Sequence, residues 1–596
     1  MDSRDRRLGM DRAISRRDFL NGVGVTVGAS LLPGCAGTSR QMIGDTSGYY
    51  PPAETGMRGS HPGSFETAHA TVQGQSWSAE NTGEHYDLVV VGAGISGLSA
   101  AYIYHRDVKP NARVLILDNH DDFGGHAKRN EFTLDGRTFI GYGGTMLIEA
   151  ADSYPDIAKQ VLRELGIDHH RLSEYHHEDL FALHGAGRVS FFDKETFGSD
   201  FLARGEHGFS DSIDNVPLSG SAKTELERLF ADEIDYLPGM TPAERREVLE
   251  SASWSEYLER FADIGDEVLR FIQKWPQGVW AIGADALPAW MAWNVGYPGF
   301  AGMDLGLNDE SDGEEDDGRF YFPDGNASVA RLLIRELIPG VAPGSSMEDV
   351  VTARFDYSTL DRPENFTRIR LNSTVVGLRH QDGDLNAAVD VTYVNGTKNR
   401  TIKANKVVWA GYHAMLPHIC PDVSQNQAAA LSSSVRAPLV YTNVLIRNWR
   451  SLADLGVQRA YCPGSFFQGV MFTHPVSIGD YRFSQSPDEP VILHMSHIPL
   501  SPGLSAPDQF RAGRQALLAT SFETFERNVR DQLGRMLGPG GFDSALDIAG
   551  ITVNRWAHGY AYSVDDESGD VAWWPERWQH VRRPWVDARQ RVGNIA

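Results

Sequence analysis

A short segment near residue 90 constrains the fold more than any other part of the chain. The apolar, β-branched run 86–91 predicts a buried strand, and Gly92, Gly94 and Gly97 follow it at once in the spacing Gly-x-Gly-x-x-Gly. The first glycine allows a sharp turn, the second lets a pyrophosphate approach the backbone, and the third lets a helix pack on its strand. The segment therefore predicts a helix that holds phosphates at its N-terminus.

A second predicted strand makes this signal specific. The predicted strand spans 113–117, is apolar from Val114 to Leu117, and is followed by Asp118, which lies 21 residues after Gly97. An acid at this distance accepts hydrogen bonds from the ribose of a bound dinucleotide. Strand, turn, helix, strand and terminal acid in this order indicate an α/β chain with a Rossmann-like domain, which a lone glycine motif would not.

Length and charge exclude several other classes of protein. The 596 residues are 41% hydrophobic, so we expect more than one domain, or one cofactor-binding fold with a large insertion. Lys and Arg number 55 against 79 Asp and Glu, a formal net charge of −24 at pH 7. This charge disfavours nucleic-acid phosphates and favours cationic or neutral small molecules as partners.

The N-terminal region has the features of a targeting segment. Residues 15–20, Ser-Arg-Arg-Asp-Phe-Leu, precede the mildly apolar stretch 19–33, and together they predict a twin-arginine export signal over 1–35 and a periplasmic protein. The stretch is too short and too rich in glycine to span a bilayer. Cys35 leaves a lipid anchor open, and the composition of 36–84 predicts a linker.

Cysteine and histidine usage gives no metal motif. Cys35, Cys420 and Cys462 are too few for a disulfide scaffold and leave at most one bridge, between the last two. Several histidines gather in one region without zinc-site spacing, and we expect them to be ordinary exposed or core residues with no metal bound. They are His169, His170, His176, His177 and His184.

The loop after the second strand suggests a family. Residues 121–127, Asp-Asp-Phe-Gly-Gly-His-Ala, resemble the FAD-dependent amine oxidase and phytoene desaturase superfamily, with His126 where many amine oxidases have Arg. The segments 141–145, 192–198 and 321–326 narrow the resemblance to bacterial spermidine dehydrogenases, along most of the chain after the proposed linker.

The resemblance implies FAD as cofactor and a set of contacts for it. In that superfamily a Val in a strand such as 369–378 holds the adenine through its backbone. The implied cofactor-binding residues are Gly92, Gly94, Ser96, Gly97, Asp118, Asn119, Gly124, Gly125, His126, Ala127, Gly143, Gly144, Thr145, Val375 and Val376. Haem b is a further group that the resemblance allows, and no residue of the sequence marks its ligand.

The implied architecture is a Rossmann-like FAD-binding domain with an inserted α+β substrate, or cap, domain. Helical patterns around 223–262 and 505–537 fit such a cap. We expect the last FAD-binding part to be truncated, because the family has a closing strand and helix at this point. The expected FAD-binding parts are 85–190, 321–420 and 551–596, and the substrate parts are 191–320 and 421–550.

The implied reaction is hydride transfer from a polyamine such as spermidine to the flavin, giving an imine that hydrolyses to an aldehyde and an amine, with the electrons passed to an acceptor. Distal ammonium groups need carboxylates, and the reacting nitrogen needs a dry aromatic surround. The candidate catalytic residues are the carboxylates Asp285 and Glu195 and the aromatic residues Tyr441, Tyr560 and Tyr562. A helix cap or ion pair is the alternative role for Asp285.

The acidic run 309–317 predicts a solvated loop whose field would attract a polycation.

Two other functions fit the same sequence. A desaturase or an amino-acid oxidase has the same fold, but the first needs a long apolar tunnel and the second a basic anchor for a carboxylate. The other alternative, from a different class, is an exported, non-catalytic binding protein that has lost its flavin.

Overall fold

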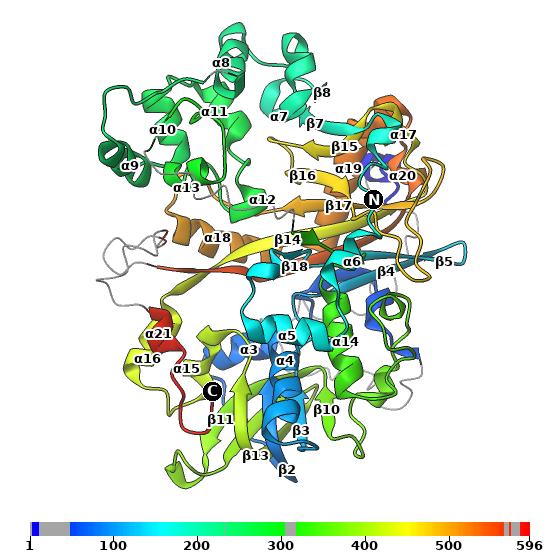
Figure 1. Ribbon diagram of the computed structural model, residues 1–596, viewed down its shortest axis with the longest axis vertical. Coiled ribbons are helices and arrows are strands. Elements are labelled where there is room, and N and C mark those ends of the chain that lie inside the picture. Colours follow the sequence, from blue (N-terminus) through cyan, green and yellow to red (C-terminus); the bar gives the residue numbers. More distant parts are fainter. Residues whose placement is uncertain are drawn as a thin grey trace.

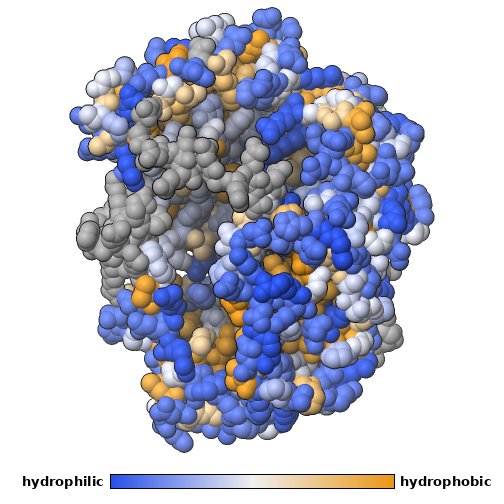
Figure 2. Space-filling view, viewed as in Figure 1, coloured by the Kyte–Doolittle hydropathy of each residue, from blue (hydrophilic) through white to orange (hydrophobic). Residues whose placement is uncertain are grey.

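Two sheets and a helical cap organise the chain, as seen in the computed structural model of Figure 1. The structure describes residues 3–10, 48–231, 233–303, 305, 318–564, 571, 573 and 584–596. The twin-arginine motif, Cys35 and the acidic run 309–317 lie outside the described residues. Hydrophilic residues dominate the face shown in Figure 2, in keeping with the high charge of the chain.

The lower sheet in Figure 1 contains the predicted nucleotide-binding strands. Its order is β10 (Thr367–Arg370), β3 (Val114–Leu117), β2 (Glu80–Val91), β13 (Lys398–Trp409), β12 (Val389–Asn395) and β11 (Ser373–His380). The first four strands run parallel, and β12 and β11 add an antiparallel edge. Residues 114–117 are fully buried, as expected of a parallel strand covered on both faces.

Helices cover the two faces of this sheet. On one face lie α4 (Ile95–Ile103) and α14 (Ala327–Leu337), which pack Leu98 and Leu333 against Val90 and Ile116. On the other face lie α15 (Leu416–Ile419) and α16 (Gln425–Ser432). The end of β2 thus meets the start of α4 at the carboxyl edge of the parallel strands, where α/β folds bind their ligands.

The eight-stranded sheet crosses the middle of the molecule. Its order is β1 (Gly56–Gly59), β18 (Ile548–Ser563), β14 (Ser434–Ile446), β17 (Val491–His497), β16 (Gly469–Phe472), β15 (Val457–Tyr461), β7 (Gly187–Phe192) and β8 (Phe201–Arg204). The helices α18 (Ala506–Ala519) and α19 (Phe522–Leu537) pack with it. A two-stranded ribbon, β4 (Arg129–Leu134) with β5 (Arg137–Tyr142), reaches β14 and β17.

The cap at the top of Figure 1 is helical, and its core continues into the adjoining strands of the middle sheet. Trp254, Tyr257 and Leu258 are completely buried in it. Two of its helices begin at capping boxes: Thr241 pairs with Glu244 at the start of α9, and Ser253 pairs with Glu256 at the start of α10. Such caps depend only on residues that are neighbours in the sequence. The cap helices are α8 (Gly220–Ala231), α9 (Pro242–Ser251), α10 (Trp254–Phe261), α11 (Asp266–Ile272), α12 (Gln277–Trp280) and α13 (Ala289–Asn294). Among the described helices, none has the length and apolar character needed to cross a membrane.

Residues 48–84 differ from the predicted linker. They contain β1, which runs parallel to β18 at 552–555, then α3 (Glu66–Val72) and the start of β2. Tyr50 and Arg58 are about 5% exposed. The linker prediction is therefore wrong for this part, because a polar, glycine-rich composition does not reveal distant partners that bury it.

The two described cysteines, Cys420 and Cys462, are buried and free, so the bridge left open by the sequence is not formed.

The last residues also have a defined place. Ile595 lies parallel to Val407, and the N–H of Trp409 donates to the carbonyl of Ala596 at 2.8 Å. The end of the described chain thus lies beside β13 of the nucleotide-binding sheet.

Candidate nucleotide and substrate site

The turn between β2 and α4 has the geometry that its glycines predict. Gly92 has a φ of +110°, and a Cβ there would lie 2.7 Å from the carbonyl oxygen of Ala410. A Cβ on Gly97 would lie 2.0 Å from the carbonyl oxygen of Gly92. At Gly94, by contrast, a Cβ would meet only the Cα of Gly125, at 3.8 Å. Two glycines are thus required by the fold itself, and the middle one leaves the backbone open to a ligand.

The loops after β3 and β5 close on this turn. Gly124 and Gly125 have φ values of +96° and +58°, and Gly94 forms a bridge with Gly124. A Cβ on Gly144 would lie 1.8 Å from the carbonyl oxygen of His126, so only glycine fits. We call the combined surface the glycine cradle; it consists of Gly92, Gly94, Gly97, Gly124, Gly125, Gly143 and Gly144.

Asp118 fastens the cradle to the end of β3. It is 5% exposed, and its carboxylate accepts hydrogen bonds from the N–H of Ala93 at 2.6 Å and of His120 at 2.8 Å. Burial raises the pKa of this carboxyl, although the two N–H groups oppose the shift. The side chain of the neighbouring Asn119 donates to the carbonyl of Ser64. Each carboxylate oxygen of Asp118 retains capacity for a second hydrogen bond.

The two valines predicted at the adenine lie on β11 beside this acid. The N–H of Ser373, at the start of β11, donates to the carbonyl of Asp118 at 2.7 Å. The register with β12 shifts between Val375 and Gly377, so Val376 sits in a bulge. A bulged residue leaves its backbone groups outside the ladder, where a ligand can use them. The predicted position is therefore next to the cradle.

A row of rings lies near the cradle beside strands β14 and β17; Tyr142 and His494 are buried, and the other rings are partly buried. The ring centroids of Tyr441 and His494 are 4.8 Å apart, those of His494 and Tyr142 are 4.6 Å apart, and those of Tyr142 and His474 are 4.7 Å apart. The row continues through Tyr321, stacked on His474 at 4.0 Å. It ends at His176, whose ring stacks on Tyr321 at 3.8 Å. We call this row the ring stack; its members are His176, Tyr321, His474, Tyr142, His494 and Tyr441.

Burial leaves the imidazoles of His474 and His494 in the ring stack uncharged. Burial lowers the pKa of His474 and of His494 to about 3, so both imidazoles are neutral at pH 7. Burial also raises the pKa of the Tyr142 and Tyr441 hydroxyls, and a hydrogen bond with Tyr560 contributes at Tyr441. The surroundings of these rings therefore favour an uncharged group over an ammonium ion.

Three buried asparagines join the ring stack to the cradle. The side-chain N–H of Asn443 donates to Oδ1 of Asn130 at 2.9 Å, and its Oδ1 accepts from Nδ1 of His494 at 3.1 Å. Asn554 bonds Asn130 at 2.6 Å and the carbonyl of Tyr441 at 3.0 Å, and it lies against Gly143. This network fixes strands β14 and β18 of the middle sheet against the cradle.

The cradle region also contains buried polar atoms without a hydrogen-bond partner. They include His120 Nδ1, Trp409 Nε1 and His558 Nδ1. His558 lies 4.4 Å from the ring of Tyr412, whose hydroxyl is 3.5 Å from Nε2 of His126. Burial lowers the pKa of His126 to about 4 and that of His558 to about 3. Open cradle backbone and unsatisfied polar atoms together fit a large ligand with many hydrogen-bonding groups, such as FAD.

Several predicted site residues have other partners in the structure. Asp285 accepts hydrogen bonds from Gln273 at 2.5 Å, from the N–H of Gly503 at 2.7 Å and from Gln509 at 2.9 Å. Glu195, whose side chain is 58% exposed, pairs with Arg535 at 2.7 Å. These contacts join helices and loops of the cap and the middle sheet, and the two acids are not brought to the ring stack.

The predicted tyrosines divide between two places. Tyr441 is a member of the ring stack, and Tyr560 is its hydrogen-bond partner. The hydroxyl of Tyr562 donates to the carbonyl of Trp280 at 2.6 Å, and its ring stacks on Phe510. No sequence pattern indicated Tyr142, His474, His494 or the three asparagines as site residues. No local spacing marks them, because they come from strands that are distant in sequence.

Comparison with known proteins supports the nucleotide-binding class of the fold. A model of the NAD(P)-binding Rossmann-like domain family matches residues 90–165. This range contains the whole glycine cradle, and strand β2, the turn at Gly92 and helix α4 follow one another in the order that such a domain requires. The chain thus contains a Rossmann-like domain, and the predicted α/β fold class is confirmed.

Among solved structures, the chain is similar to wild-type putrescine oxidase bound to putrescine and to cyclohexylamine oxidase from Brevibacterium oxydans IH-35A. Each alignment has 16% sequence identity and a TM-score of 0.46, and covers 86% of this chain and 92% of the other. Similarities of this size establish neither a substrate nor a reaction for this chain.

Proposed function

We propose that the protein is an FAD-dependent amine oxidoreductase that acts on a polyamine such as spermidine. The observation that supports this most is the junction of the glycine cradle with a largely buried, neutral ring stack through Asn554. The cradle suits a dinucleotide, and the rings suit an amine that must lose its proton before it reacts. The spermidine-like substrate rests on the resemblance of the motifs at 121–127 and 321–326 to spermidine dehydrogenases.

The residues that would hold FAD surround the cradle. The N-terminus of α4, next to Gly94, would bind the pyrophosphate, Asp118 the ribose, and the bulge at Val376 the adenine. Bound FAD supplies the acceptor for a hydride from the carbon next to the amine. The protein's own contribution is position and a dry environment.

The ring stack would prepare the amine. An aliphatic ammonium approaching Tyr441 leaves water, and desolvation disfavours its charged form. The neutral imidazoles of His474 and His494 add no positive charge that would repel it. The faces of Tyr441 and Tyr560 attract the cation on its way in. These groups would therefore bring an uncharged amine nitrogen to the reacting position.

The test is the visible absorption spectrum of purified full-length protein before and after anaerobic addition of spermidine. We expect flavin bands that bleach with spermidine and persist with an equal concentration of sodium chloride. Flavin bands that persist with spermidine would reject the substrate and keep the cofactor. A preparation that neither contains nor binds FAD would favour the alternative of a non-catalytic binding protein. The resemblance also allows haem b, which a Soret band in the same spectrum would show.

One observation favours a second candidate, an amino-acid oxidase. Arg436 and Arg514 lie together near His558, where their charges help burial to lower the pKa of that imidazole. Arg514 donates to the carbonyl of Arg436 at 2.5 Å. Two guanidinium groups form a basic anchor of the kind that an α-carboxylate needs. Bleaching by an L-amino acid and not by spermidine would select this function, and an Arg436→Met variant should then raise KM for the amino acid.

We further propose that the chain is exported to the periplasm through its twin-arginine signal, with a lipid anchor at Cys35 as an extension. The support is the order of Arg16, Arg17 and the apolar stretch 19–33. Arg16→Lys combined with Arg17→Lys should retain the protein in the cytoplasm, and fractionation of cells measures this.

A further inference from the structure

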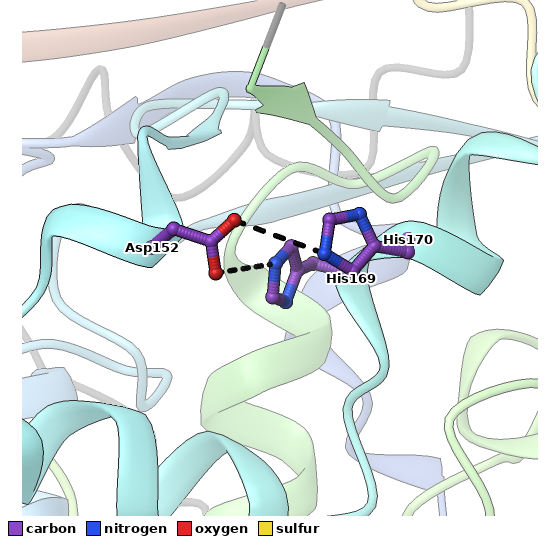
Figure 3. A group of neighbouring side chains, drawn as sticks. All are labelled: Asp152, His169 and His170. Atoms are coloured by element: carbon purple, nitrogen blue, oxygen red, sulfur yellow. Dashed lines mark ion pairs between the residues drawn. The ribbon is translucent and has the colours of Figure 1, made fainter. Parts of the chain in front are cut away.

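Two histidines and an aspartate from separate parts of the chain converge on one point outside the proposed FAD and amine site (Figure 3). Asp152 belongs to a short 3-10 turn, η4 (Ala151–Ser153), and His169 and His170 begin α6 (His169–Ser173). One ligand atom from each side chain lies within 4.8 Å of the other two. We propose that this cluster binds a divalent transition-metal ion, with zinc as the preferred metal.

The distances within the cluster suit metal ligands better than a hydrogen-bonded ion pair. Nε2 of His169 lies 3.4 Å from one carboxylate oxygen of Asp152, and Nε2 of His170 lies 3.7 Å from the other. Hydrogen bonds between nitrogen and oxygen are usually about 2.7–3.2 Å long. Ligands bound tetrahedrally to zinc at about 2.0–2.2 Å lie roughly 3.3–3.6 Å from one another. The two nitrogen-to-oxygen separations are therefore close to the edges of a zinc coordination shell, and the three ligand atoms, which lie within 4.8 Å of one another, would draw together slightly around a bound ion.

Burial adds a second, independent observation. Nε2 of His169 is shielded from solvent and has no hydrogen-bond partner, although it faces the carboxylate. A buried ring nitrogen without a partner is costly unless some other group satisfies it. A metal ion placed between His169, His170 and Asp152 would satisfy this nitrogen and neutralise the carboxylate together.

Local structure holds the three ligands in place. Ala150 has a φ of +50°, and its N–H donates to the carbonyl of Gly318 at 2.8 Å, which fixes the turn that presents Asp152. Asp168 caps α6 through the N–H of Arg171 at 3.1 Å. The ring of His169 packs edge-on against Phe320, with the centroids 4.9 Å apart. The cluster is thus supported by backbone bonds and packing on both sides.

The donor set selects the class of metal. Two imidazoles and one carboxylate suit zinc and its neighbours in the transition series, whereas magnesium and calcium prefer oxygen ligands alone. Three protein ligands leave a fourth position, which water can take because the side chains of Asp152 and His170 are 61% and 70% exposed. Binding would cross-link the 150–153 turn to α6. Among the described residues, the ion pairs of Asp152 with His169 and His170 join these two segments, and no backbone hydrogen bond does.

The test is isothermal titration of zinc chloride into untagged, full-length protein that has been treated with a chelator and dialysed. We expect one equivalent bound by the wild type, and an affinity at least about 10-fold lower in a His169→Ala/His170→Ala double variant and in Asp152→Asn. His418→Ala, at an exposed histidine on α15, is the matched control and should bind zinc as the wild type does. Circular dichroism in metal-free buffer should show the same fold for all four proteins.

Two further readouts separate a built site from adventitious binding. Bound cobalt should give absorption bands typical of a tetrahedral site, and these should be absent in the double variant. Zinc should raise the unfolding midpoint of the wild type and of His418→Ala, and should leave that of the double variant and of Asp152→Asn unchanged. Zinc binding that is equal in the wild type and the double variant, or absent from the wild type, would overturn the proposal.

Discussion

Arg58 and Asp121 form a two-bonded ion pair that joins β1 of the middle sheet to the loop after β3. The two nitrogens of the Arg58 guanidinium lie 2.6 and 2.9 Å from the two carboxylate oxygens. His61 lies 3.3 Å from the same carboxylate. Burial favours the neutral form of Asp121, yet Arg58 and His61 hold the pKa of the carboxyl well below its usual range. The segment that was expected to be a linker is therefore anchored next to the proposed FAD site.

Arg58→Ala should destabilise the protein strongly, because it leaves the Asp121 carboxylate, whose side chain is 19% exposed, without its guanidinium partner. We expect a loss of about 3 kcal/mol in the free energy of unfolding, the lower end for a broken buried pair. Arg450→Ala removes an exposed pair with Asp488 and should cost less than about 1 kcal/mol. Urea unfolding measures both, and equal losses would contradict the anchoring role.

The buried histidines predict a loss of stability in mild acid. The pKa of His474 and of His494 falls from 6.5 to about 3 on folding, so below pH 6.5 the unfolded chain binds protons that the folded chain does not. Stability is thus complete above pH 6.5 and falls as the pH drops towards 3, by up to about 1.4 kcal/mol per pH unit for each histidine. His474→Phe should flatten the fall of the unfolding midpoint between pH 7 and pH 5, whereas the exposed His418→Phe should leave its slope unchanged.

The glycine cradle predicts that two alanine substitutions have different consequences. Gly94→Ala meets no atom closer than 3.8 Å, so the chain should fold normally but lose FAD affinity by about 10-fold or more, or about 1.4 kcal/mol. Gly144→Ala places a Cβ 1.8 Å from a backbone carbonyl and should prevent normal folding. Gly278→Ala meets nothing within 4 Å and serves as the control. Flavin titration and thermal unfolding together distinguish the three.

Tyr441 should matter through its ring more than through its hydroxyl. Tyr441→Phe keeps the aromatic face beside His494, whereas Tyr441→Leu removes it. With cation–π attraction of about 0.5–2 kcal/mol, we expect the Leu variant to lose roughly 2- to 30-fold in kcat/KM for spermidine and the Phe variant to lose less. Steady-state kinetics with an artificial acceptor provide the measurement. Equal activity in all three proteins would remove Tyr441 from the substrate site.

Asp285 and Glu195 should affect stability rather than amine recognition. Asp285→Ala leaves the buried amide of Gln509 and the N–H of Gly503 without their acceptor, which should cost about 1–3 kcal/mol and leave KM for spermidine unchanged. Glu195→Gln weakens only an exposed pair with Arg535 and should change neither quantity. A large rise in KM for either variant would restore its role as an ammonium anchor.

The described site shows which kinds of signal a sequence contains. The three glycines of the first turn and Asp118 could be predicted because their roles depend on neighbours within about 30 residues, in one strand-turn-helix unit. The roles of Asp285 and Glu195 could not, because a carboxylate has the same sequence signature whether it binds a ligand or a helix N–H. His169 and His170 were noticed only as a concentration of histidines, since their partner Asp152 has no fixed spacing from them.

The sequence by itself determined the Rossmann-like α/β unit, because its signals are local. A turn with a positive φ at Gly92 and a close backbone approach at Gly97 accepts little but glycine. Buried parallel strands need apolar runs of residues. Tertiary structure alone decided that β1 returns to β18, and that Tyr142, His474 and His494 meet in one stack. These contacts join segments hundreds of residues apart. They arise from burying complementary surfaces, and such burial leaves no periodic trace in the sequence.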